Sequence, residues 1–255
     1  MKINSVDKAV TVLNCFSQNE PVLKVGVISK MTGYTPSTVS RLLSTLEARG
    51  VVERADGYGC YQLGYRIYFW GLISQKQNNL ANLALPITEA LRDKCGEEVS
   101  LYIVVENHRT CLQRVPSKHG IAMTGSIGEH LPLHTGASGQ VLLAYLDEKR
   151  RRRIIENEKL EGFTKKTLTD PIKLLAKLRK IREQGYAVSL EEREPGAYSI
   201  VAPVRDVSGR VIASLSIAGP VYRLDDKVLK ANIADVKKSA ALISEKIGFT
   251  PVQEK

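Results

Sequence analysis

The sequence predicts an α+β protein of two domains, and three observations carry that prediction. Apolar residues recur at helical spacing in the first 50 residues. Two short segments typical of β-strands then flank an Asp-Gly pair. Beyond residue 97, segments in which apolar and polar residues alternate are interleaved with segments of helical spacing. This order favours an N-terminal winged helix-turn-helix, a linker helix and a C-terminal α/β domain with a mainly antiparallel sheet. We expect these parts to span residues 1–64, 65–79 and 80–250.

The segment between Thr35 and Gly50 has the features of a complete helix. Thr35 suits the N-cap, Pro36 suits the first helical position, and Gly50 can end the helix in a left-handed conformation. One face is apolar, formed by Val39, Leu42, Leu43 and Leu46. The opposite face offers hydroxyl groups and one guanidinium, on Ser37, Thr38, Ser40, Arg41, Ser44 and Thr45. Such groups meet phosphate oxygens and base edges, so we predict that this helix enters the major groove of DNA.

Two further helices are predicted before this one. Residues 24–33 favour a short helix that turns Met31 inward and ends at Gly33, and residues 5–21 favour an amphipathic helix with Ser5 as its N-cap. Two short helices joined by a tight turn form a helix-turn-helix, and the first helix would complete its three-helix core.

The runs after the third helix predict a β-hairpin, the wing, around the Asp56-Gly57 pair. Arg54 and Tyr58 flank the turn, and we expect both to contact the DNA backbone. The same elements also describe a small helical subdomain with a hairpin that binds no nucleic acid. The hairpin directly behind the hydroxyl-rich helix favours DNA binding.

Composition narrows the choice of partners and compartment. The net charge of +10 suits double-stranded DNA, but residues 1–79 hold nine Lys/Arg and five Asp/Glu and the remainder holds 28 and 22, so the excess is not concentrated in the N-terminal domain. No apolar run approaches the length of a membrane span, and no signal-peptide pattern opens the chain. We therefore predict a cytoplasmic protein with no membrane partner. Four scattered cysteines predict reduced thiols.

The segment that joins the domains is unusually aromatic. It predicts one helix from Tyr65, a polar stretch at residues 75–79, and a second helix up to Cys95. Its large apolar side chains are Tyr65, Tyr68, Phe69, Trp70 and Leu72. So many apolar groups predict an interface, either with the winged domain of the same chain or with a second copy. We expect both, and hence a homo-oligomer.

The remaining elements of the C-terminal domain can be placed in order. Residues 98–115 predict a strand pair, and a helix that starts after Thr135 is expected to continue through the basic run 149–153. Residues 171–184 predict a helix capped by Asp170. Three strands between residues 186 and 219 and a final helix over residues 224–247 complete the domain.

Small residues at the start of the helix after Thr135 suggest an anion site. Gly136, Ala137 and Ser138 leave backbone N–H groups open to a ligand, and Ser199 and Ser216 lie in apolar strands where their hydroxyls need partners. A bound carboxylate would supply them. Close packing of helix on sheet, with the serines bonded to backbone, explains the same residues without a ligand.

At this point the sequence resembles the IclR family of bacterial transcriptional regulators. The segments "TVSRLLSTLEARGVVER", "LHTGASGQVLLAYL" and "GYAVSLEEREPGAYSIVAPVRDVSGRVIASLSIAGP" carry the resemblance, which extends from about Ser5 to Ile247. It implies a winged helix-turn-helix, a linker helix and a GAF-like effector domain. It also implies homodimers or dimers of dimers on palindromic operators, and effectors that are small organic, aromatic or sugar-derived acids.

The chain departs from the family pattern at positions that bear on function. Thr35-Pro36 stands where the family often has Pro then Lys, which removes a basic group near the DNA. Ser189 and Ala218 stand where many members have Asp and Ser, at positions that the resemblance places near the effector pocket. A less polar pocket is therefore expected.

Patterns typical of enzymes are weak. The four histidines and Cys111 lack zinc-site spacing, and no Gly-x-Ser-x-Gly element is present. We expect no cofactor and no metal. The sequence thus predicts a DNA-binding transcriptional regulator, with a repressor favoured, whose operator affinity is controlled by a small organic or aromatic acid. The alternative is a GAF-like small-molecule enzyme or redox sensor that uses the N-terminal module for dimerisation.

Overall fold

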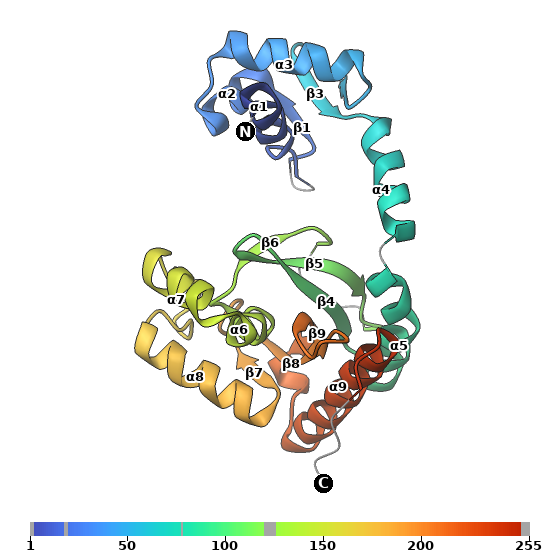
Figure 1. Cartoon of the computed structure of the whole chain (residues 1–255), viewed down its shortest axis with the longest axis vertical. Helices are drawn as coiled ribbons and strands as arrows, with labels where there is room; N and C mark the ends of the chain where they lie inside the picture. The colour runs from blue at the N-terminus through green and yellow to red at the C-terminus, as the bar shows by residue number, and fades with distance from the viewer. Residues whose placement is uncertain (1–2, 18–19, 78, 120–125, 251–255) are drawn as a thin grey trace. The chain divides into compact units, whose positions relative to one another are not determined.

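The chain forms two compact units that divide after Asn78 (Figure 1). The computed structural model describes residues 3–17, 20–77, 79–119 and 126–250. The division lies inside the polar stretch at residues 75–79, where the linker helix was expected to end. Among the described helices, none combines the length and the apolar character that a membrane crossing requires.

The first unit contains four helices and a small antiparallel sheet of strand order β1-β3-β2. Its described elements are α1 (Asn4–Leu13), β1 (Val22–Lys24), α2 (Val25–Thr32), α3 (Pro36–Ala48), β2 (Val52–Arg54), β3 (Cys60–Leu63) and α4 (Tyr65–Gln77). The predicted helix-turn-helix is thus α2 and α3, and the wing is β2 and β3. Buried Val12, Ile28, Val39 and Leu43 bring α1, α2 and α3 into one core with the wing.

The caps of α3 explain where this helix begins and ends. The Thr35 side chain accepts a hydrogen bond from the backbone N–H of Thr38, and Pro36 takes the first helical position. Gly33 ends α2 with φ of 72°, and Gly50, with φ of 68°, follows the end of α3. Both glycines adopt the left-handed region that other residues enter at a cost.

Two local predictions in this unit were wrong. Ser5 is not the cap of α1, because the helix begins at Asn4 and Ile3 stands at the N-cap without a side-chain hydrogen bond. Met31 lies on the outer face of α2 and is half exposed. The hairpin forms around the Asp56-Gly57 pair as predicted, and both Gly57 and Gly59 adopt positive φ in its turn.

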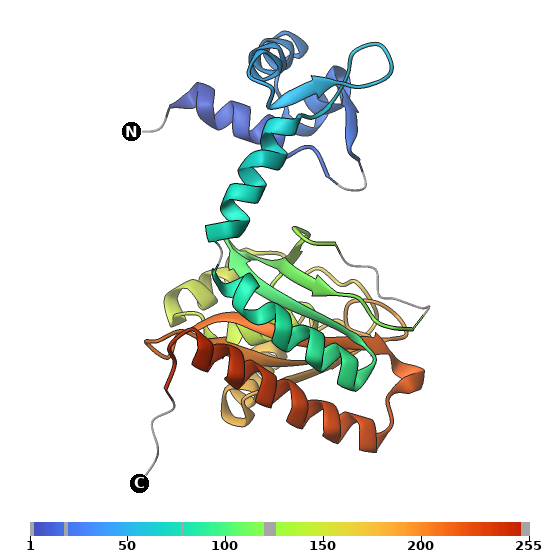
Figure 2. The same ribbon diagram turned by 90° about the vertical axis from the view of Figure 1, so that its right-hand side faces the viewer.

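The second unit is built on a six-stranded antiparallel sheet of order β6-β5-β4-β9-β8-β7. Its described elements are α5 (Asn79–Cys95), β4 (Glu98–Val105), β5 (His108–Val115), β6 (His130–Pro132), α6 (Gly136–Tyr145), α7 (Glu148–Asn157), α8 (Pro171–Gln184), β7 (Ala187–Leu190), β8 (Ala197–Arg205), β9 (Val211–Pro220), the 3-10 turn η1 (Val221–Arg223) and α9 (Asp226–Lys246). Helices α5 and α9 cover one face of the sheet, and α6 and α8 cover the other (Figures 1 and 2).

Alternation along the strands separates the two faces. On β9, Leu215 and Ile217 pack with α5 and α9, whereas Ser214 and Ser216 point to the side of α6. The apolar face forms the larger core, and the serine-bearing face leaves space beside the start of α6. One helix prediction needs correction here. The basic run does not continue α6, because Asp147 accepts a hydrogen bond from the N–H of Arg150 and begins the separate helix α7.

Candidate functional site

The exposed face of α3 carries most of the predicted DNA-contacting residues. The side chains of Ser37, Ser40, Arg41 and Ser44 are exposed. Thr38 is half-buried, and its hydroxyl lies 3.0 Å from that of Thr35 within the N-cap. The Arg41 guanidinium makes no hydrogen bond or ion pair with the described part of the chain, so it can reach a phosphate or guanine. Its contact with DNA stays a prediction.

The wing places its two predicted residues differently. Tyr58 lies at the tip and is fully exposed. Arg54 lies at the base, where its Nε is 3.1 Å from the Glu47 carboxylate and its guanidinium stacks over the Tyr61 ring, 5.0 Å from the centroid. An exposed ion pair of this kind contributes little to stability. Arg54 can therefore exchange Glu47 for a phosphate at small cost.

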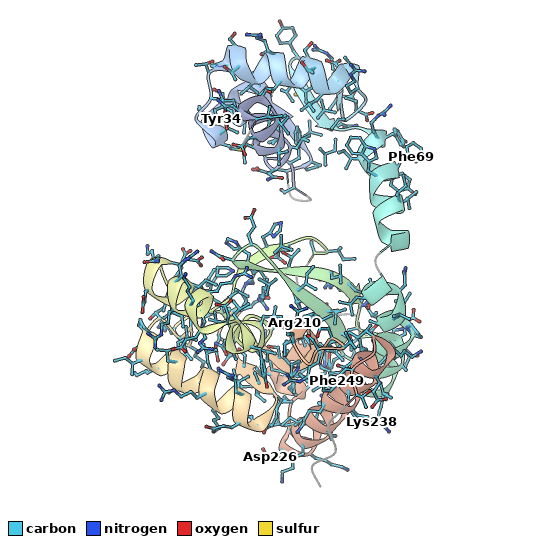
Figure 3. All side chains as sticks on the ribbon, in the orientation of Figure 1. Tyr34, Phe69, Arg210, Asp226, Lys238 and Phe249 are labelled. Carbon is cyan, nitrogen blue, oxygen red and sulfur yellow. The ribbon has the colours of Figure 1, made fainter. Side chains whose placement is uncertain are left out.

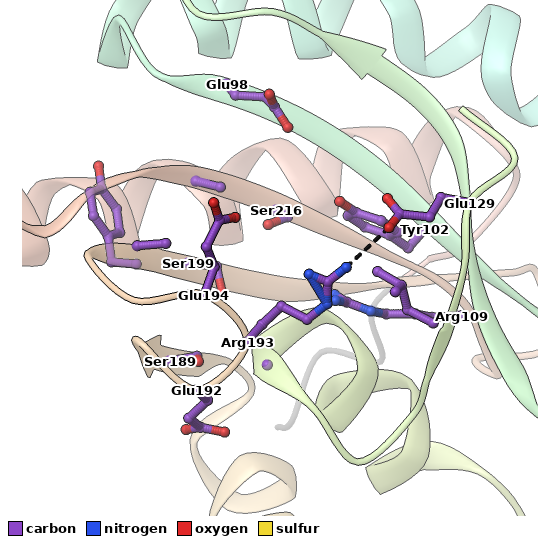
Figure 4. A pocket seen from close by; sticks show the side chains of 15 residues that line it. Glu98, Tyr102, Arg109, Glu129, Ser189, Glu192, Arg193, Glu194, Ser199 and Ser216 are labelled. Carbon is purple, nitrogen blue, oxygen red and sulfur yellow. Dashed lines mark hydrogen bonds and ion pairs between the residues drawn. The ribbon is translucent and has the colours of Figure 1, made fainter. Parts of the chain in front are cut away.

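The second unit contains a cavity between the sheet and the start of α6 (Figure 4). Its lining combines apolar surface with an unusual number of charged and hydroxyl-bearing side chains, whereas ligand cavities generally have only a few polar groups. The lining residues are Glu98, Tyr102, Arg109, Glu129, Leu131, Gly136, Ser189, Glu192, Arg193, Glu194, Ala197, Tyr198, Ser199, Ser216 and Ala218.

Two arginines form one end of this cavity. Arg109 is 6% exposed, and within the described residues it makes no hydrogen bond or ion pair. Its guanidinium stacks over Tyr102, 5.2 Å from the ring centroid. A Cβ placed on Gly136 would lie 3.9 Å from both of its terminal nitrogens, so the cation faces the first turn of α6. Arg193 lies beside it and pairs with Glu129 at 3.0 Å (Figure 4).

Burial sets the electrostatics at this end. Desolvation lowers the pKa of Arg109 below its ordinary value, because the interior disfavours its charged form. Burial also raises the pKa of Tyr102 to about 12, although the neighbouring Arg109 acts in the opposite direction. A buried arginine is normally paired, because an unpaired buried charge is costly. A cation that faces a helix N-terminus is therefore arranged to receive an anion.

The opposite wall is made of acceptors and hydroxyls. Strand register places Ser189, Ser199, Ala218 and Glu98 in one row across β7, β8, β9 and β4. Glu98 is buried and accepts hydrogen bonds from Arg114 at 2.5 Å and from Ser100 at 3.2 Å. None of the hydroxyls of Ser189, Ser199 and Ser216 hydrogen-bonds to another described residue.

The structure brings five of the seven predicted effector residues to this cavity. These are Gly136, Ser189, Ser199, Ser216 and Ala218. Ala137 and Ser138 do not line it. Ala137 is fully buried in the core beneath α6, and the carbonyl of Ser138 accepts a hydrogen bond from Ser214 at 3.3 Å. The first turn of a helix presents only one side to a ligand, so the residues after Gly136 pack inward.

The departures at Ser189 and Ala218 both lie in the lining of the cavity, and the expectation that they make it less polar stays a prediction. Sequence reasoning missed Arg109, Arg193 and Glu98, which carry part of its charge beside the other three glutamates of the lining. For Arg109 the reason is a β-bulge: Leu101 pairs with Gln113 but Tyr102 pairs with Cys111, so β5 gains a residue and changes face. An excess of arginine in a strand next to a turn was the available signal.

The thiols show no sign of activation. Burial raises the pKa of Cys111 to about 11 and also raises the pKa of Cys95. At neutral pH both are protonated, and a protonated thiol is a poor nucleophile. Within the described residues, no group of three or more His, Cys, Asp or Glu side chains is placed to bind a metal ion.

These features define a class of protein. A winged helix-turn-helix joined to a domain with a cavity that charged side chains line is the architecture of a DNA-binding regulator that senses a small molecule. Residues 5–56 match the IclR helix-turn-helix domain, and residues 74–245 match the bacterial transcriptional regulator IclR C-terminal family. The chain belongs to the IclR family of transcriptional regulators, which are not enzymes.

Similar proteins cover almost the whole chain. The HTH-type transcriptional regulator XynR of Escherichia coli (strain K12) is 31% identical over 248 residues, 97% of this chain and 98% of that protein. The transcriptional repressor IclR of the same organism is 25% identical over 92% of this chain and 87% of its own length. An IclR homologue from Microbacterium hydrocarbonoxydans, solved in complex with 4-hydroxybenzoate, shares the fold with a TM-score of 0.84 at 24% identity, over 96% and 99% of the two chains.

Proposed function

We propose that this regulator is a repressor whose operator affinity is controlled by a small organic acid. The acid would bind in the cavity between the sheet and the start of α6. The observation that supports an acid is Arg109, a buried cation that faces the start of α6 and makes no hydrogen bond or ion pair with the described residues. The similarity to the repressor IclR supports the repressor role. The 4-hydroxybenzoate complex of a protein with the same fold supports an acidic ligand.

The coupling follows from linkage between two binding events. A ligand changes DNA affinity only if it binds more tightly to one arrangement of the protein than to another. The carboxylate would bridge Arg109 and the N–H groups at Gly136, and so join β5 to α6. Because both elements belong to the sensor unit, we expect the acid to stabilise that unit and to favour the arrangement with weak operator affinity.

A two-part experiment tests this function. The full-length protein is screened with a panel of carboxylic acids and their uncharged amides, by thermal shift and by fluorescence anisotropy on a promoter fragment. We expect at least one acid to raise the melting temperature and to release DNA, because a ligand that binds only the folded state stabilises it. The amides should do neither. If no acid changed either signal, control by an acid would be excluded.

We further propose that the regulator acts as a homodimer joined in part through α4. Six large side chains of this helix are 39% to 73% exposed, and some project outward in Figure 3, where Phe69 is labelled. They are Tyr65, Tyr68, Phe69, Trp70, Leu72 and Ile73. A palindromic operator needs two recognition helices at a fixed spacing, which a dimer provides.

We expect Trp70→Ala to weaken dimerisation and operator binding together. The loss should be about 2 kcal/mol or more, since large aromatic side chains dominate interface energies. Sedimentation velocity measures the dimer, and anisotropy on the operator measures DNA binding. Ile172→Ala, which removes another exposed apolar side chain in α8, is the matched control and should change neither. A fully dimeric Trp70→Ala protein would place the interface elsewhere.

A further inference from the structure

The cavity has two chemically different ends. Arg109 and Arg193 lie together at one end, on the side of the β4–β5 turn and the start of α6. Glu98 lies at the far end of the same hairpin, because it begins β4 whereas Arg109 pairs with Val104 near the turn (Figure 4). A ligand that spans the cavity therefore meets two arginines at one end, where Glu129 pairs with Arg193, and the Glu98 carboxylate at the other.

The cationic end has capacity for one carboxylate. Arg109 is uncommitted within the described residues, whereas Arg193 already shares its charge with Glu129. At the other end Glu98 repels a second negative group, since Arg114 neutralises it only from one side. This arrangement disfavours a dicarboxylic acid and favours a ligand with a single negative end.

The middle of the cavity requires hydrogen-bonding groups. The hydroxyls of Ser189, Ser199 and Ser216 face it, and within the described chain they are unpartnered. A carboxylate such as Glu98 can accept up to about four hydrogen bonds, and two donors are in place. An aromatic or aliphatic body would leave these groups buried and unsatisfied, which costs binding free energy. A ligand rich in hydroxyls would satisfy them.

We propose that the ligand is a polyhydroxylated monocarboxylic acid, held by Arg109 at its carboxylate and by the three serines and Glu98 at its hydroxyls. This inference rests on the proposed control by an acid and selects one chemical class within it.

A matched ligand series tests the inference on the full-length protein. Isothermal titration calorimetry compares five- and six-carbon aldonates with four other ligands. Hexanoate lacks the hydroxyls, glucarate adds a second carboxylate, and sorbitol has hydroxyls but no carboxylate. Benzoate is an aromatic acid without hydroxyls. We expect an aldonate to bind at least about 100-fold more tightly than each of the others, because a site built for hydroxyls strongly rejects analogues without them.

Serine variants locate the hydroxyl contacts. Ser199→Ala and Ser216→Ala should each weaken aldonate binding about 10-fold, in line with the loss of one hydrogen bond. Ser239→Ala, on α9 and away from the cavity, should not change it. Tighter binding of hexanoate, benzoate or glucarate would overturn the inference and leave control by an acid intact. If no acid bound at all, the proposed function would fail as well.

Discussion

Arg109→Met is expected to reduce the affinity for the acidic effector at least about 100-fold while leaving operator affinity unchanged. Removing one partner of a buried charge pair costs about 2–5 kcal/mol. In the bound state the effector carboxylate would be that partner, since the structure gives Arg109 no other among the described residues. Methionine keeps much of the side-chain volume and removes the charge, so the cavity wall stays filled.

The stability of the ligand-free protein separates this explanation from simple damage to the fold. An unpaired buried guanidinium is costly, and its replacement by an apolar side chain is often neutral or stabilising. We therefore expect the ligand-free melting temperature of Arg109→Met to equal or exceed that of the wild type. Arg109→Lys keeps the charge but loses the bidentate geometry. Its effector affinity should lie between that of the wild type and that of Arg109→Met. Normal effector affinity in Arg109→Met would move the anion site away from this end of the cavity.

Gly139→Ala is expected to destabilise the sensor unit by about 3 kcal/mol, at the upper end of the cost of overpacking a core. A Cβ on Gly139 would lie 2.6 Å from the carbonyl oxygen of Leu133 and 3.0 Å from its carbonyl carbon. Both atoms belong to the backbone and cannot rotate away. Helix α6 would have to shift, and its first turn forms part of the cavity, so effector binding should weaken as well.

The expected sign is opposite to the ordinary effect of this substitution. Alanine in place of a helical glycine normally stabilises by about 0.5–1 kcal/mol. Gly71→Ala in α4 is the matched control, because apart from its chain neighbours and the backbone of its own helix no described atom lies within 4 Å of its new Cβ. Urea unfolding followed by circular dichroism measures both variants. A Gly139→Ala protein as stable as the wild type would show that α6 is not held against Leu133.

Local sequence features predicted most of the fold. The caps at Thr35 and Asp170 and the left-handed glycines at Gly33 and Gly185 act within one helical turn, so the residues themselves fix where these helices begin or end. The alternation of β8 and β9 likewise predicted two long strands. The strand β1 was missed because three residues carry no measurable period. The break before α7 was missed because the helical pattern runs through it, and the cap at Asp147 is decided by a single hydrogen bond.

The candidate sites were predictable to different extents. The polar face of α3 follows from its own period, because all of its residues lie on one helix. The cavity draws on β4, β5, β7, β8, β9 and α6, and only the resemblance to a family brought Ser189 and Ala218 to it. Ala137 was included because it is adjacent to Gly136 in sequence, but a helix turns adjacent residues about 100° apart.

By itself the sequence determined most of the order of the elements, the polar face of α3 and the family to which the chain belongs. Each of these depends on neighbours in the chain or on the spacing of short motifs. Only the tertiary structure decided that Arg109 and Glu98 share one cavity and that Arg109 makes no hydrogen bond or ion pair with the described residues. The bulge at Leu101 and Tyr102 reverses the face of β5, and the order of the strands decides which rows are adjacent. The charge of a site therefore depends on which distant strands pair and in which register. The alternation of residues along a single strand does not reveal this pairing.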